Sequence, residues 1–161
     1  MRPRQESSER RPAVAVFFRE LETLVADGFI VKSSRIEPSI NAMNARGGRL
    51  ISILRALPEA DYATLKANNP WIVAPLPGVM GWNGPVPAGK TQVIYLPESL
   101  EREPAADVRL TIAHEIAHCL LGHTRLPADD PANETAAWHK AIDLGFGTVE
   151  AVSAFRKKHG V

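Results

Sequence analysis

Apolar residues recur at helical spacing in the first quarter of the chain. Within 13–27 the apolar positions fall three or four residues apart, with charged residues between them: Val14, Phe17, Phe18, Leu21, Leu24 and Val25. This pattern predicts an amphipathic helix over 13–27 that ends near Gly28. Residues 29–33 then favour a short strand, and residues 38–48 favour a short helix that ends at a double glycine.

The next stretch carries a weaker signal. The run "RLISILRAL" at 49–57 fits a helix or a strand, as short apolar runs often do. Pro58 suits the first turn of a helix, which predicts a helix over 58–69. From 70 to 97 proline and glycine are frequent beside β-forming residues. There we expect a hairpin-like pair of strands, near 71–75 or 78–82 and near 91–96.

The last third of the chain is predicted to be helical. One helix is expected over about 104–122, because Pro104 suits its first turn and Gly122 its end. A second is expected over 131–144, with Asp130 as its N-cap and Gly145 after its end. A third is expected over 148–160, with Thr148 as its N-cap, basic residues in its last turn and Gly160 as its stop.

Composition is that of an ordinary globular domain of 161 residues, with 45% hydrophobic and 23% charged residues. The 19 basic and 18 acidic residues are mixed along the chain, so we expect no direct nucleic-acid partner, which would need a clustered basic face. Residues 1–12 hold four arginines and are expected to form a flexible basic tail. A single cysteine, Cys119, and the lack of a long apolar run predict a cytoplasmic protein without a membrane span.

Three of the five histidines lie within 114–123, in the stretch "TIAHEIAHCLLGH". His114 and His118 are four apart, so on a helix their rings project from one face and reach one metal ion together. Glu115 is turned about 100° around the helix, where a carboxylate can act as a base towards a metal-bound water. This is the H-E-x-x-H arrangement of zinc hydrolases, with two ligands and a base.

A catalytic zinc ordinarily takes a third protein ligand. Glu134 is the candidate, because it shares the apolar stripe of the helix predicted over 131–144, where a carboxylate needs a cation nearby. Stabilisation of the first helical turn is the competing explanation for Glu134. His123 is the rival ligand, although its spacing from His118 does not match a third-histidine motif; a pocket-lining or helix-capping role is the stronger prediction.

Other residues carry weaker expectations. Tyr95, on the predicted strand "TQVIYL", is a candidate for supporting an oxyanion, or simply a half-buried strand residue. Cys119 is expected to be a buried structural thiol and Trp138 a core residue. Solvent-exposed or minor roles are expected for the remaining histidines and nearby aspartates: His139, His159, Asp129, Asp130 and Asp143.

The segments "RLTIAHEIAHCLLGH" and "ETAAWHKAIDLG" resemble the ImmA/IrrE family of zinc metallopeptidases. The resemblance covers residues 71–145 well and the earlier residues only in outline. It implies a zincin-like core, one Zn2+ per chain held by His114, His118 and Glu134, and Glu115 as the base. It also implies a protein substrate of the repressor type, since relatives are known for cleaving transcriptional repressors.

Together these patterns predict a single α+β domain over 13–161, a zincin-like metallopeptidase core. In it a small, mostly antiparallel sheet would pack on the active-site helix and further helices. The predicted function is that of a zinc-dependent endopeptidase acting on a protein partner, with no membrane partner; the oligomeric state stays open. Two alternatives remain: a regulator-binding module that does not cleave, and a DNA-associated anti-restriction factor, against which the near-neutral charge counts.

Overall fold

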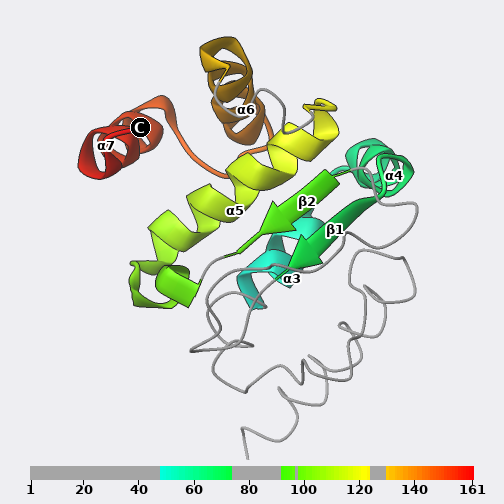
Figure 1. Ribbon diagram of the computed structural model, residues 1–161, viewed down its shortest axis with the longest axis horizontal. Coiled ribbons are helices and arrows are strands. Elements are labelled where there is room, and N and C mark those ends of the chain that lie inside the picture. The colour runs from blue at the N-terminus through cyan, green and yellow to red at the C-terminus, as the bar shows by residue number, and fades with distance from the viewer. Residues whose placement is uncertain (1–47, 74–91, 97, 124–129) are drawn as a thin grey trace, which may run out of the picture.

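A computed structural model describes residues 48–73, 92–96, 98–123 and 130–161. The elements in chain order are α3 (Gly48–Ala56), α4 (Glu59–Ala67), β1 (Pro70–Val73), β2 (Gln92–Tyr95), the short 3-10 helix η2 (Glu98–Arg102), α5 (Ala105–Leu120), α6 (Pro131–Asp143) and α7 (Val149–His159) (Figure 1). The basic tail, the helix over 13–27 and the strand over 29–33 lie outside the described residues, as does nearly all of the helix over 38–48.

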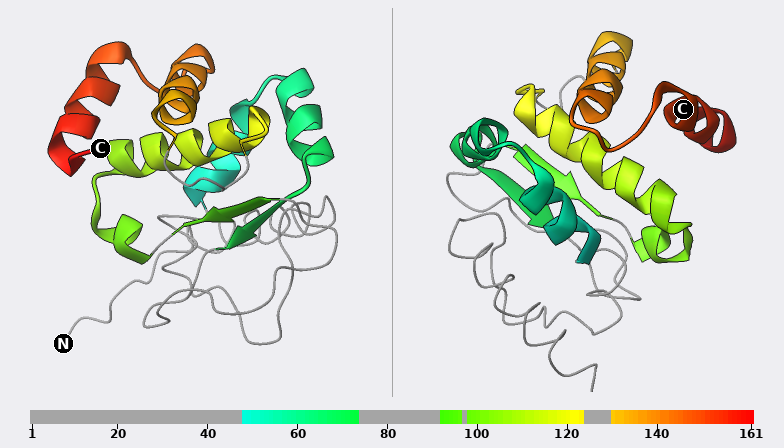
Figure 2. Two further views of the ribbon diagram at one scale, coloured as in Figure 1. Left: turned by 45° about the horizontal axis from the view of Figure 1, so that its top comes forward. Right: turned by 180° about the vertical axis from the view of Figure 1, so that it is seen from behind.

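Helix α5 is the centre of the described structure. It lies between the two strands on one side and α6 on the other, and it also packs against α3 and α4 (Figures 1 and 2). A helix covered on several sides must be apolar around most of its circumference. The buried apolar residues of α5 meet this demand: Val108, Leu110, Ile112, Ala113, Ile116, Ala117, Cys119 and Leu120. The H-E-x-x-H motif therefore lies on a helix that packs against α3, α4, α6 and β2.

Helix α3 resolves the ambiguity of the run 49–57. Leu50, Ile53, Leu54 and Leu57 are all buried, and they stand at positions i, i+3, i+4 and i+7. This is the spacing of one helix face, and in a strand the same four residues would not share a face. The buried face of α3 packs against α5, so the helical spacing within the run and its tertiary contacts agree.

The predicted helix ends are confirmed in the last third of the chain. The Asp130 side chain accepts a hydrogen bond from the N–H of Ala132 at 2.9 Å, and Thr148 accepts one from Ala151 at 3.2 Å. Both bonds satisfy an N–H that would otherwise lack a partner at a helix start. Gly160 ends α7 in the left-handed conformation with φ +71°, which favours glycine.

The expected α+β zincin-like core with a mostly antiparallel sheet is wrong for the described residues. Helices make up most of these residues, and the strands β1 and β2 are only four residues long. The pair runs parallel, with Pro70 opposite Gln92 and Val73 opposite Tyr95, so the predicted hairpin is also wrong. Parallel strands often have short continuous apolar sequences, and both "WIV" of β1 and "VIY" of β2 fit that pattern. Residues 74–91, which connect the strands, lie outside the described residues.

Helix α7 is tied to the beginning of α5 by charged groups. The Lys158 ammonium donates to the carboxylates of Glu103, at 3.1 Å, and Asp107, at 2.5 Å. The His159 ring lies 3.5 Å from the same Asp107 carboxylate.

Among the described helices, none combines the length and the apolar content that crossing a bilayer requires.

Candidate metal centre

Helices α5 and α6 bring three potential metal ligands together. His114 and His118 are one turn apart on α5, and Glu134 faces them from the first turn of α6. The Nε2 atoms of the two histidines are 3.0 Å apart. The Glu134 carboxylate places Oε2 3.0 Å from Nε2 of His114 and Oε1 3.2 Å from Nε2 of His118. These are the three ligands that the sequence predicted, and they form one group of donor atoms.

Hydrogen bonds alone do not explain this group. Each imidazole Nε2 carries either a proton or a lone pair, and an ionised carboxylate can only accept. If both His114 and His118 carry the proton on Nε2, two N–H groups face each other across 3.0 Å. If either lacks it, a lone pair faces the carboxylate of Glu134. With Glu134 ionised, at least one of the three contacts is therefore repulsive, and a cation between the donors makes all three favourable.

The size of the group suits zinc. Zn–N and Zn–O bonds of about 2.0–2.1 Å in a tetrahedron place neighbouring ligand atoms about 3.3–3.4 Å apart. The observed separations of 3.0, 3.0 and 3.2 Å fall within a few tenths of an ångström of that value. Two imidazoles and one carboxylate are also a donor set typical of catalytic zinc, in which a fourth position is left open. The residues present therefore fit a zinc ion.

Burial is uneven around the group. The side chain of His114 is 9% exposed and that of His118 18%, whereas that of Glu134 is 40% exposed. Burial, aided by the neighbouring His118, lowers the pKa of His114 to about 3. Burial also lowers the pKa of His118, against the opposing effect of the Glu134 carboxylate. Both rings are therefore neutral at physiological pH, the form that binds metal, and the group opens to solvent on the Glu134 side.

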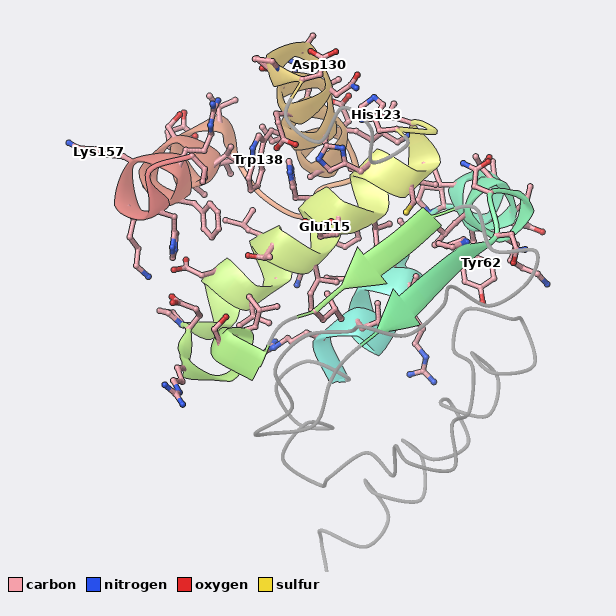
Figure 3. The ribbon with its side chains drawn as sticks, viewed as in Figure 1. Tyr62, Glu115, His123, Asp130, Trp138 and Lys157 are labelled. Carbon is pink, nitrogen blue, oxygen red and sulfur yellow. The ribbon has the colours of Figure 1, made fainter. Side chains whose placement is uncertain are left out.

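The two histidines are held in different ways. Nδ1 of His114 is buried and has no hydrogen-bond partner among the described residues, while its ring stacks on the indole of Trp138. Nδ1 of His118 lies 3.0 Å from Nδ1 of His123. His123 follows the end of α5, as Figure 3 shows, and its contact is with the edge of the His118 ring opposite the ligand group. The sequence analysis found Trp138 as a core residue but gave no sign of its stacking on His114.

Two further residues were proposed to take part in catalysis, Glu115 and Tyr95, and the structure describes the side chain of Glu115 only. Glu115 lies midway along α5 and is half-buried (Figure 3). It directly follows His114 on a continuous helix, so it is turned about 100° away from that ligand. Tyr95 is the last residue of β2, which packs on α5. The side chain of Tyr95 lies outside what the structure describes.

The other predictions can be checked against burial. Cys119 is a buried thiol that forms no disulfide within the described residues, as expected. His139 and Asp143 are exposed, and Asp130 caps α6. Asp129 lies outside the described residues.

The sequence analysis missed a second group of potential ligands, formed by Glu103, Asp107 and His159. Glu103 and Asp107 lie at or just before the start of α5, and His159 is the last residue of α7, so no local spacing in the sequence could indicate the group. Lys158 already supplies a positive charge to both of the carboxylates, so this group works as an ion-pair cluster that holds α7.

No protein-family model, curated protein sequence or solved structure matches this chain. The functional argument therefore rests on the residues and on the geometry that they adopt.

Proposed function

We propose that this protein is a zinc-dependent endopeptidase that hydrolyses peptide bonds of a protein partner. The observation that carries the proposal is the meeting of His114 Nε2, His118 Nε2 and the Glu134 carboxylate within 3.0–3.2 Å of one another. Three protein ligands of this type leave a zinc ion one position for water or substrate. The sequence resemblance to the ImmA/IrrE metallopeptidases supports the same activity.

When bound, the zinc ion supplies Lewis acidity, which polarises a substrate carbonyl and acidifies a water molecule. The chain supplies the rest. His114 and His118 enter the reaction as neutral rings, because burial keeps the pKa of each below its usual value. Glu115 is the proposed general base: its carboxylate takes a proton from the attacking water and passes one to the departing amine. Glu115 is half-buried and directly follows His114 on α5, so its side chain starts one residue away in sequence from a proposed ligand.

The proposed substrate is a protein of the repressor type, and this part of the proposal rests on the family resemblance alone. An extended substrate segment would suit a site in which a strand lies beside the metal helix, since peptides often bind by adding a strand to a sheet. Strand β2 packs on α5 and so provides this neighbourhood. The proposed role of the Tyr95 hydroxyl, support of the oxyanion, belongs to the same strand.

The first experiment is a metal analysis of the purified, reconstituted protein beside Glu134→Ala and His123→Ala. We expect about one zinc per chain in the parent at saturating metal, loss of zinc with Glu134→Ala, and an unchanged stoichiometry of about one zinc per chain at saturating metal with His123→Ala. A parent protein that binds no zinc after reconstitution would overturn the proposal. Retention of full zinc affinity by Glu134→Ala would remove Glu134 from the site.

The second experiment tests cleavage with a proteome-derived peptide library and mass spectrometry of the new termini. Glu115→Gln preserves the shape and polarity of the side chain but removes the base, so it should keep zinc and lose cleavage by about 100-fold or more. Asp143→Asn is a matched control, because it makes the same acid-to-amide change at an exposed position on α6. If the zinc-loaded parent cleaves no peptide, the peptidase proposal fails and a non-cleaving binding module takes its place.

A further inference from the structure

Helix α5 ends in a hydrogen-bonded cap that turns the chain back over its last turn. The N–H of Gly122 donates to the carbonyl of Cys119 at 3.2 Å, and the N–H of His123 donates to the carbonyl of His118 at 2.9 Å. Gly122 has φ +68°, in the left-handed region. This pair of bonds is the Schellman motif, in which the residue after the glycine comes to lie beside the residue five positions before it. The cap therefore places His123 beside His118.

Helix α6 ends in the same way, which gives an internal comparison. Gly145 has φ +80°, its N–H donates to Ile142, and the N–H of Phe146 donates to Ala141 at 3.1 Å. In that cap the residue after the glycine is the buried Phe146, as expected for a motif that is often accompanied by an apolar contact. The equivalent position of the α5 cap is His123. The cap of α5 thus has a polar, hydrogen-bonding ring at the position where the cap of α6 has an apolar ring.

The contact that results is specific in its atoms. Nδ1 of His123 lies 3.0 Å from Nδ1 of His118, while Nε2 of His118 faces His114 and Glu134. The two rings are inclined at 63° with centroids 5.2 Å apart, so they meet at their edges and not face to face. A histidine that binds a metal through Nε2 holds its proton on Nδ1, and that proton needs an acceptor. Nδ1 of His123 stands where the acceptor is required.

We propose that His123 is a positioning residue for the metal centre. It accepts a hydrogen bond from Nδ1–H of His118, and so holds the His118 ring in the tautomer and orientation that present Nε2 to the metal. This inference rests on the proposed zinc site and adds to it a residue that is not a ligand. His123 contacts Nδ1 of His118, whereas Nε2 of His118 faces the other two proposed ligands. His123 is therefore assigned a place outside the first coordination sphere.

Two substitutions separate this role from a purely structural one. His123→Phe gives the α5 cap the same final residue as the α6 cap, so the cap should still form while the acceptor is lost. His123→Asn restores an acceptor, because the Asn side-chain oxygen stands close to the position of Nδ1. We expect zinc affinity, measured by competition with a chromogenic chelator, to fall about 10–100-fold in His123→Phe. In His123→Asn it should stay within about threefold of the parent.

Cobalt absorption spectra of the same variants test the coordination sphere directly. We expect the Co2+ ligand-field bands of His123→Phe to keep the shape of the parent spectrum, since the ligands are unchanged. Equal zinc affinity in the parent and His123→Phe would overturn the inference, and so would a changed coordination spectrum, which would make His123 a ligand. A loss in His123→Asn as large as that in His123→Phe would also overturn it. A parent protein that binds no zinc is a different outcome and refutes the proposed site itself.

Discussion

The imidazole of His114 lies almost flat on the indole of Trp138, with ring centroids 3.9 Å apart and planes inclined at 26°. The two residues come from different helices, and Trp138 stands one turn after Glu134 on α6. One helix thus provides one proposed ligand, Glu134, and the ring that stacks on another, His114. Because Nδ1 of His114 has no hydrogen-bond partner among the described residues, we expect stacking to take the orienting role that a hydrogen bond ordinarily plays.

This relationship predicts how the site responds to changes at Trp138. Trp138→Phe keeps an aromatic face beside His114 and should bind zinc nearly as tightly as the parent. Trp138→Leu removes the face and should weaken zinc binding about tenfold. Both variants lose core volume and should unfold more easily, by about 1–4 kcal/mol. Titration with zinc under native conditions distinguishes the effects, and equal affinities for the two variants would contradict the orienting role.

If zinc binds the group that joins α5 to α6, it should stabilise the folded chain. A ligand that binds only the folded chain at 100 times its Kd stabilises it by about 2.7 kcal/mol, or about 5–10 °C in melting temperature for a domain of this size. We expect this increase in the parent protein, its reversal by EDTA, and its absence in Glu134→Ala. Differential scanning calorimetry provides the measurement. An equal increase in Glu134→Ala would show that zinc binds elsewhere.

The helical part of the structure could be predicted because it depends on local signals. Asp130 and Thr148 cap their helices as their residue types indicate, and the spacing of His114 and His118 sets their common face once α5 is a helix. Glu134 could be chosen because it interrupts the apolar stripe that includes Trp138. Each of these inferences uses residues less than two turns apart.

The rest depends on contacts that local patterns do not contain. The segment 74–91 between β1 and β2 is long enough to connect two strands in either direction, so its sequence did not predict their parallel pairing. The sequence analysis set His123 aside as a third ligand because its spacing from His118 does not match a third-histidine motif. That comparison did not consider the end of α5, where the cap places His123 beside His118. The sequence "LGH" after an apolar helix was the signal that could have predicted a cap that brings His123 beside His118.

The ion-pair cluster around Asp107 predicts a dependence of stability on pH. A hydrogen bond from Lys158, aided by His159 and opposed by burial, holds the pKa of Asp107 below its usual value of 3.8. A carboxyl whose pKa is lower in the folded state stabilises the fold above the unfolded pKa and loses this effect as the pH falls through the folded pKa.

We therefore expect Asp107→Asn to lower the melting temperature slightly at pH 6–7, with a difference that disappears below the folded pKa. The control is Asp143→Asn, since Asp143 is exposed. Thermal denaturation followed by circular dichroism between about pH 2 and 7 tests this. A difference from the parent that grows as the pH falls would contradict it.

The two helix caps provide the strictest test of the link between α5 and the metal centre. Gly122 and Gly145 both have positive φ, and a Cβ added at either position would meet no atom within 4 Å. Alanine at either position should therefore cost only the backbone strain of the left-handed conformation, about 1–2 kcal/mol. Only Gly122 precedes a residue that contacts a proposed ligand.

We expect Gly122→Ala and Gly145→Ala to be destabilised alike in urea unfolding of the apo-protein, while zinc affinity falls severalfold in Gly122→Ala alone. Equal zinc affinities in the two variants would show that the cap of α5 does not control the metal centre.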